Sequence, residues 1–147
     1  MKTHQKLKKL QVIGIPFANA TPSAGFEEVL AAYETANVYQ KAGVPVLLRR
    51  PTLDDADRRA EETENIGLVN GSIADIAAAA RQNGGSVLMT GGNCCHITGI
   101  LGGLQDAHGP NTRIGLVWFD AHGDFNTPNT TLSGMLGGMQ HVRGPDG

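Results

Sequence analysis

Short apolar runs alternate with amphipathic or charged stretches along this 147-residue chain. The apolar runs have the length of buried strands and are rich in β-branched residues, so they predict strands. The predicted strands cover residues 11–17, 44–48, 86–90 and 114–119. Between them, apolar residues at three- and four-residue spacing, or alanine runs, are typical of helices; the predicted helices cover residues 26–42, 73–82 and 95–107. This alternation predicts an α/β fold with a doubly wound, mainly parallel sheet.

Glycine and capping residues mark several of the predicted boundaries. Gly43 closes the first predicted helix and Gly84 closes the second, because glycine readily adopts the backbone conformation that ends a helix. Asn70 and Ser72 are alternative caps for the start of the second helix. The stretch 51–67 is rich in charge and poor in apolar residues, so we expect a surface loop with a short helix and a solvated face rather than a binding patch.

The apolar run at 114–119 leads directly into three side chains that favour metal ions. Asp120, His122 and Asp124 follow the run at two-residue intervals. In an extended chain, side chains two residues apart project to the same side, and parallel sheets place their sites at the carboxyl ends of strands. Two carboxylates and an imidazole at such an edge predict a site for a divalent ion such as manganese, zinc or iron.

The same three residues also have a simpler interpretation, because Asp and His after a strand often cap a helix or solvate a turn. The next segment, 126–134, favours the metal site. It is a turn-forming loop dense in hydroxyl and amide groups, which suits the recognition of a polar substrate beside metal ligands.

Composition narrows the classes of function. The formal net charge of −2 and a pI near 6.2 provide no basic field, so no nucleic-acid partner is expected. No apolar run approaches the ~20 residues of a membrane-spanning helix, and the two adjacent cysteines cannot build a disulfide framework. We therefore expect a cytoplasmic protein with no membrane partner.

Two motifs resemble the arginase and agmatinase (ureohydrolase) family. The segment DAHGDFNTPNTTLSG at 120–134 is similar to that family's DAHxDxN signature, and its continuation resembles the arginase branch. The segment GGNCC at 91–95 stands where the family has GGDHS. From about residue 11 onward, the resemblance implies a three-layer α/β/α fold, a centre of two manganese ions, and hydrolysis of a guanidino or amidino substrate with release of urea.

The resemblance also implies roles for individual residues. Asp120 would bridge the two metal ions, His122 would bind one of them, and Asp124 would bind the other and orient the attacking hydroxide, which is a catalytic role. The residue at position 94 would share the ion that Asp124 holds. The positions that recognise the amino-acid end of arginine in arginases are matched here by Asn126, Thr131 and Ser133.

The first motif departs from the family at the metal-binding histidine, which is Cys94 here. A thiolate can bind a metal, but soft sulfur favours zinc or iron over manganese. Two alternatives stay open. In the first, His96 replaces Cys94 as the metal ligand. In the second, Cys94 and Cys95 are small buried side chains, which is the commoner state of free cysteines.

Two further departures concern the end of the sequence. Gly137 stands where the arginase pattern has a proton-shuttling histidine, and His141 is out of register with that position. The family's later strands and its second Asp-x-Asp pair have no counterpart after Gly134. The sequence thus predicts an apparently truncated arginase-like domain, with a tail at 1–10, the domain at 11–139 and an atypical tail at 140–147.

Two hypotheses about function follow. In the first, the chain is an arginase-like amidinohydrolase that uses a metal-activated hydroxide and whose site is completed by residues that these 147 do not include. In the second, it is a non-catalytic relative that keeps a metal site and stabilises a larger complex. Both predict a homo-oligomer or a complementing chain, because a sheet cut midway leaves an exposed edge.

Overall fold

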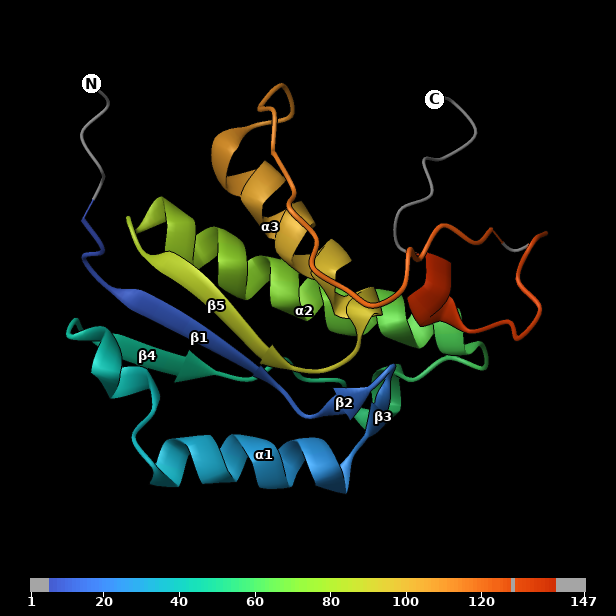
Figure 1. Cartoon of the computed structure of the whole chain (residues 1–147), viewed down its shortest axis with the longest axis horizontal. Coiled ribbons are helices and arrows are strands. Elements are labelled where there is room, and N and C mark those ends of the chain that lie inside the picture. The colour runs from blue at the N-terminus through green and yellow to red at the C-terminus, as the bar shows by residue number, and fades with distance from the viewer. Residues whose placement is uncertain (1–5, 128, 140–147) are drawn as a thin grey trace.

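A parallel sheet with helices on both faces forms the centre of the molecule (Figure 1). The computed structural model describes residues 6–127 and 129–139; the predicted tail at 140–147, with His141, lies outside the described residues. The central strand is β1, Leu10–Ile15, which pairs in parallel with a neighbour on each side. These neighbours are β4, Val46–Arg49, and β5, Ser86–Gly91.

The strand β1 is buried along its whole length, because helices cover both of its faces. Ile13 and Ile15 point to the same face of the sheet, which helix α2, Glu62–Gln82, covers. Both belong to the larger core cluster. Helix α3, Ile97–His108, packs against α2 on this side of the sheet (Figure 1). Burial of these two faces explains why β1 reads as a continuous apolar run in the sequence.

The opposite face of the sheet packs against helix α1, Ala24–Thr35. Leu30 is the buried residue of α1, and a Cβ at Gly14 of β1 would lie 3.2 Å from one of its methyl groups. The 3-10 turn η1, Tyr39–Ala42, adds Tyr39 to a second, smaller core cluster on this face. The chain therefore has the α/β fold with helical layers on both sides of the sheet that its sequence predicts.

Most predicted elements are present with shifted ends. The strands β1, β4 and β5 and the helix α3 match their predicted ranges to within two residues at each end. The first predicted helix, 26–42, divides into α1 and η1, because Asn37 between them adopts a left-handed conformation with a φ of 51°. Gly43, with a φ of 68°, ends η1 at the predicted position.

Helix α2 begins at Glu62, well before its predicted start. Ile66 and Val69 are buried, so the apolar stripe of the helix continues into the stretch that we expected to be a loop. Asn70 and Ser72, the predicted caps, lie inside the helix, where their side chains bond to other segments. No helix in the described part of the chain, α2 included, is both long and apolar enough to span a membrane.

The predicted strand at 114–119 is wrong, because none of these described residues belongs to a strand. Val117 and Phe119 are 78% and 94% exposed. A strand shares backbone hydrogen bonds with a neighbouring strand, whereas a hollow of about 350 Å³ adjoins the start of this segment, and its lining includes both Ile114 and Ser86 at the start of β5. The apolar pattern of residues 114–119 favours a strand, but a local pattern does not determine whether a neighbouring strand is placed beside it.

Two glycines of α3 allow this helix to approach α2 closely. A Cβ at Gly99 would lie 2.8 Å from the carbonyl oxygen of Asn70, and a Cβ at Gly103 would lie 2.5 Å from that of Ala74. The alanine run at 77–80 contributes Ala77 to this contact, and its Cβ would lie 2.7 Å from a Cβ at Gly103. The two helices therefore meet nearly backbone to backbone.

A small antiparallel hairpin follows β1 and reaches toward the carboxyl end of the sheet. It consists of β2, Phe17–Ala18, and β3, Thr21–Pro22. Asn19 in its turn has a left-handed φ of 54° and donates its backbone N–H to the side-chain oxygen of Asn93, just after β5, at 3.2 Å. This contact ties the hairpin to the segment that carries the candidate site.

Candidate metal site

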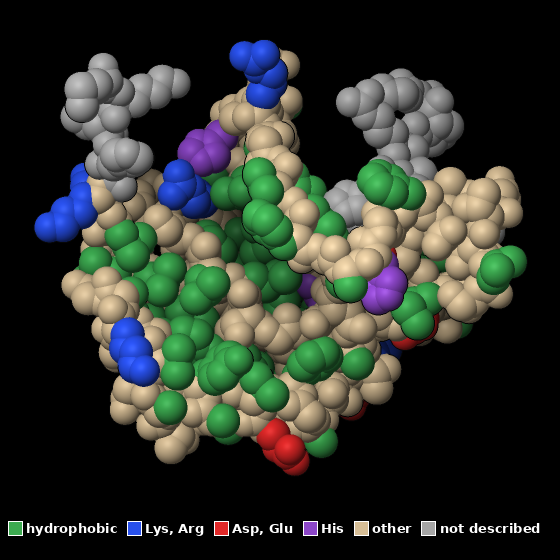
Figure 2. All heavy atoms as spheres, in the orientation of Figure 1, with side chains coloured by type: hydrophobic (Ala, Val, Ile, Leu, Met, Phe, Trp, Pro, Cys, Tyr) green, Lys and Arg blue, Asp and Glu red, His purple; other side chains and the backbone are tan. Residues whose placement is uncertain are grey.

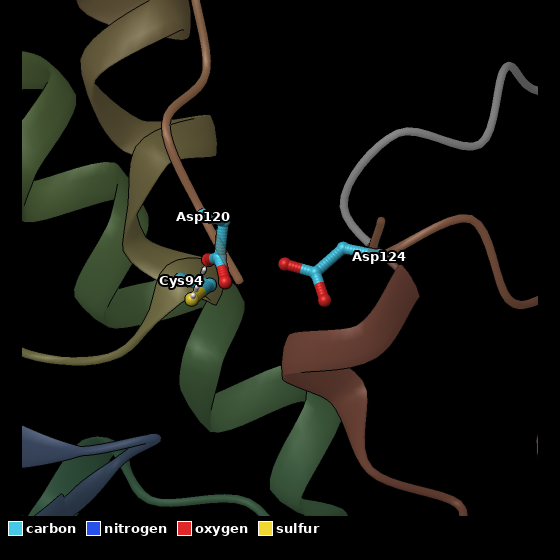
Figure 3. Close-up of side chains that lie close together, drawn as sticks. All are labelled: Cys94, Asp120 and Asp124. Atoms are coloured by element: carbon cyan, nitrogen blue, oxygen red, sulfur yellow. Dashed lines mark hydrogen bonds between the residues drawn. The ribbon is translucent and has the colours of Figure 1, made fainter. Parts of the chain in front are cut away.

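Three metal-binding side chains meet beyond the carboxyl end of β5 (Figure 3). Cys94 comes from the 3-10 turn η3, Cys94–His96, whereas Asp120 and Asp124 come from the irregular segment that follows α3. One ligand atom of each side chain lies within 4.8 Å of the other two, and the carboxylate of Asp124 points toward Asp120 and Cys94. Two hard oxygen ligands and one soft sulfur ligand are a suitable set for a divalent metal ion.

The turn that carries Cys94 depends on two glycines. Gly91 and Gly92 have φ values of 76° and 72°, which favour glycine. A Cβ at Gly91 would lie 2.5 Å from the carbonyl oxygen of Ile15, so the backbones of β1 and the turn leave no room for a side chain. The chain can therefore leave the sheet in a tight turn and place Cys94 at its edge.

Cys94 contacts one carboxylate of the cluster directly. Its Sγ donates to Oδ2 of Asp120 at 3.8 Å. Burial raises the pKa of the Cys94 thiol, and the negative charges of Asp120 and Asp124 raise it further. The sulfur is therefore a thiol at neutral pH in the metal-free chain, and a divalent cation would favour the thiolate by compensating these charges.

Asp120 is held in its ionised form by its own turn. The backbone N–H of His122 donates to Oδ1 of Asp120 at 3.0 Å, and this bond is the main cause that lowers the pKa of the Asp120 carboxyl group. An ionised carboxylate is the form that binds a metal ion.

Asp124 has two features of a side chain held for a ligand. Its φ of 51° is uncommon for a residue other than glycine. Its Oδ2 atom is buried and has no hydrogen-bond partner in the described part of the chain. Because a buried carboxylate oxygen without a partner is costly, a cation beside Asp120 and Cys94 would supply the missing interaction. The residues present therefore fit a metal ion.

His122 lies beside the cluster rather than within it. Its side chain is 83% exposed, and its Nδ1 lies 3.5 Å from Oδ1 of Asp120. The absence of a strand before Asp120 explains this position, because without strand geometry the side chains of Asp120, His122 and Asp124 need not project to one side. The role of His122 as a metal ligand stays a prediction.

His96 is fully buried, and both of its ring nitrogens are engaged. Nδ1 accepts the backbone N–H of Asn93 at 2.9 Å, so Nε2 carries the proton and donates to the carbonyl oxygen of Asn19 at 2.8 Å. Burial lowers the pKa of His96, which keeps the ring neutral. This geometry does not support the alternative in which His96 replaces Cys94 as the ligand.

Cys95, unlike Cys94, has the properties of a buried structural cysteine. It is 4% exposed and belongs to the larger core cluster. Its Sγ donates to the side-chain oxygen of Asn19 at 3.7 Å, and burial raises the pKa of its thiol to about 11. The two neighbouring cysteines therefore have different environments, and only Cys94 joins the carboxylates.

The three residues predicted to recognise the substrate lie in the loop after the cluster and are not part of it. The hydroxyl oxygens of Thr131 and Ser133 accept backbone N–H groups of the same loop and so help to hold its shape. Asn126 is exposed, and its backbone N–H donates to the carbonyl oxygen of Gly138 at 3.0 Å. Their role in recognition stays a prediction.

An open hollow of about 460 Å³ adjoins the cluster at Asp120. Its walls include Leu116, Trp118 and Phe125, which sequence reasoning does not identify as site residues. The sequence signal for Leu116 and Trp118 is the apolar run before Asp120, which predicts a buried strand, whereas Phe125 follows Asp124 in the predicted motif. The volume lies in the range of small-molecule sites.

Comparison with known proteins identifies the family. The model described as "Arginase family" matches residues 8–144 of this chain. The chain belongs to the arginase family. Mouse arginase-1 is 30% identical to this arginase-family chain over 144 residues, which are 91% of the chain and 43% of the relative. Human mitochondrial arginase-2 is 30% identical over 156 residues, which cover 94% of the chain and 42% of the relative.

Solved arginase structures confirm the fold. The crystal structure of Entamoeba histolytica arginase in complex with L-ornithine matches with a TM-score of 0.73 at 28% identity, and the match covers 92% of this chain and 49% of the Entamoeba chain. The *Bacillus subtilis* arginase structure has a TM-score of 0.72 at 23% identity, over 90% of this chain and 45% of that one. This arginase-family chain thus spans less than half the length of these relatives and structures.

Proposed function

We propose that this arginase-family chain provides metal ligands for an amidinohydrolase that hydrolyses a guanidino or amidino compound and releases urea. The observation that supports this most strongly is the convergence of Cys94, Asp120 and Asp124 around a buried carboxylate oxygen that has no partner in the described residues. Membership of the arginase family supports the reaction class.

The three clustered side chains would hold a divalent ion, which is manganese by analogy with the family and zinc or iron by preference of the Cys94 sulfur. A bound ion of this kind lowers the pKa of water and polarises the substrate. Asp120, already ionised, supplies negative charge to the site. The free Oδ2 of Asp124 can accept a hydrogen bond from the attacking water and so orient it.

A second candidate function is a non-catalytic metal-binding subunit, and one observation favours it. Gly137 has no side chain with which to move a proton at the position where the arginase pattern has histidine. A positioned general acid or base typically contributes ~10²–10⁴-fold to a rate.

The 147-residue chain by itself is expected to release urea slowly, below about 1 s⁻¹, the lower end of ordinary enzyme turnover. Urea should be assayed with arginine, agmatine and guanidinobutyrate in excess Mn²⁺, beside a metal-free sample and an Asp124→Asn variant. Slow, metal-dependent release that Asp124→Asn abolishes supports the hydrolase. Metal binding without any release supports the non-catalytic subunit. Turnover of about 1 s⁻¹ or more from a monodisperse sample contradicts the expected loss of proton transfer at Gly137 and indicates that another residue or another copy supplies it.

Replacing Cys94 with histidine is expected to move the metal preference from zinc toward manganese. Imidazole is a harder ligand than thiolate, so the ratio of Zn²⁺ to Mn²⁺ affinity should fall at least roughly tenfold, about 1.4 kcal/mol. Competition titrations of both ions measure this ratio, with Cys95→Ala as the matched control, because Cys95 lies outside the cluster. An unchanged ratio in Cys94→His would show that the Cys94 sulfur is not a ligand.

Association with further copies or with a complementing chain is part of the same proposal. In the described residues, β5 pairs with β1 on one side only, and an open sheet edge is a template for another chain. Hydrophobic side chains also gather on the molecular face over the strands (Figure 2), and Leu47 and Leu88 of the sheet are 60% and 41% exposed. Light scattering on the purified chain measures this association. The cytoplasmic location that the sequence predicts stays a prediction.

A further inference from the structure

His96 lies next to the metal cluster in sequence and joins two segments that are far apart along the chain. Its ring donates from Nε2 to the carbonyl oxygen of Asn19, 77 residues away, at 2.8 Å. Its Nδ1 accepts the backbone N–H of Asn93, directly before Cys94, at 2.9 Å. One buried ring therefore fixes both the hairpin turn after β1 and the turn that presents Cys94.

Two further bonds close the same connection. The backbone N–H of Asn19 donates to Oδ1 of Asn93 at 3.2 Å, and Sγ of Cys95 donates to Oδ1 of Asn19 at 3.7 Å. We call these four residues, Asn19, Asn93, Cys95 and His96, the Asn19 clasp. Three of these bonds join the hairpin to residues 93–96, and the fourth joins Asn93 to His96. The clasp therefore sets the position of η3 relative to the sheet.

The imidazole ring of His96 is also fixed by packing. A Cβ at Gly92 would lie 2.6 Å from Nδ1 of His96 and 2.9 Å from a methyl group of Ile15. The ring therefore fills the space beside the glycine turn at the end of β5, close to Ile15 at the end of β1. It cannot leave this position unless the turn that carries Cys94 moves with it.

We propose that His96 is a positioning residue that holds the Cys94 sulfur at the metal site without binding the metal itself. The inference rests on the proposed function, since it concerns the ligand set of the same site. Cys94 Sγ lies 3.8 Å from Oδ2 of Asp120 only as long as η3 keeps its place. Groups that orient a metal ligand typically change metal affinity by ~10–100-fold, so loss of the ring should have an effect of this size.

Titration of the full chain with Co²⁺ tests the proposal, because thiolate bound to Co²⁺ gives an intense near-ultraviolet charge-transfer band that carboxylate ligands do not give. The wild-type chain is expected to show this band as it binds Co²⁺. His96→Leu removes both ring bonds and His96→Asn keeps an acceptor for Asn93 but loses the bond to Asn19. In both variants the band should be lost or strongly reduced and the Co²⁺ affinity should fall about 10–100-fold.

The matched controls are His108→Leu and His108→Asn, at the exposed far end of α3, which should keep the wild-type band and affinity. Circular dichroism checks folding, and if His96→Leu does not fold, His96→Asn decides by the same criterion. A full band with wild-type affinity in a folded His96 variant overturns the proposal. Co²⁺ binding by the wild type without the band also overturns it but leaves the metal site intact, whereas no Co²⁺ binding contradicts the proposed function itself.

Discussion

Replacing Asp120 with alanine is expected to lower the affinity for Mn²⁺ and Zn²⁺ by at least about 100-fold, since changes to groups that merely orient a ligand already cost ~10–100-fold. Asp120 lies at the centre of the cluster: its Oδ2 accepts from Cys94, and the carboxylate of Asp124 points toward it (Figure 3). Its pKa is lowered, so the carboxylate is ionised and available without a proton to displace. Alanine leaves only two clustered ligands.

Metal content by mass spectrometry and affinity by calorimetry measure this effect. Asp106→Ala, on the exposed side of α3, is the matched control and should bind metal as the wild type does. His122→Ala should have a smaller effect than Asp120→Ala, because its ring is 83% exposed and lies outside the cluster. Equal, near-zero metal content in wild type and Asp120→Ala at saturating Mn²⁺ and Zn²⁺ would refute the metal site.

Replacing Gly103 with valine is expected to destabilise the folded chain by about 3 kcal/mol, the upper part of the usual range for overpacking, or roughly 100-fold in the folding equilibrium. A Cβ there would lie 2.5 Å from the Ala74 carbonyl oxygen and 2.7 Å from the Ala77 Cβ. Neither atom can rotate away, because one belongs to the α2 backbone and the other is attached to it. The two helices would have to separate, with loss of their shared packing.

Gly102→Ala is the matched control for this prediction. A Cβ at Gly102 would lie 3.7 Å from the Ala74 Cβ, an ordinary contact, and alanine in a helix is favoured over glycine by about 0.5–1 kcal/mol. Urea denaturation should therefore show Gly102→Ala slightly more stable than wild type and Gly103→Val much less stable. Equal stability of Gly103→Val and wild type would mean that α2 and α3 do not meet as closely as the structure shows.

The alternation of strands and helices could be predicted from the sequence, because the periodicity of apolar residues reflects which side chains an element must bury. The elements β1, β5 and α3 were predicted with nearly correct ends. The family resemblance carried by residues 120–134 was confirmed. These features depend mainly on local residue types.

Features that depend on distant contacts could not be predicted in the same way. The end of the charged stretch 51–67 belongs to helix α2, which begins at Glu62. Ile66 and Val69 of this helix are buried in the larger core cluster, a contact that the local pattern does not show. The apolar run at 114–119 does not form a strand in the described part of the chain, where β5 pairs with β1 on one side only. In both cases the secondary structure depends on contacts with distant segments, which the local sequence pattern does not contain.

The sequence by itself predicted that residues just after β5 lie at the same sheet edge as Asp120 and Asp124, and the side chains of Cys94, Asp120 and Asp124 do lie together. It offered Cys94 and His96 as alternative ligands and could not choose between them, because both cysteine and histidine bind metals. The tertiary structure decided. Asn19, which lies on a hairpin far away in sequence, engages His96 and Cys95 through hydrogen bonds and so leaves Cys94 as the side chain that faces the carboxylates.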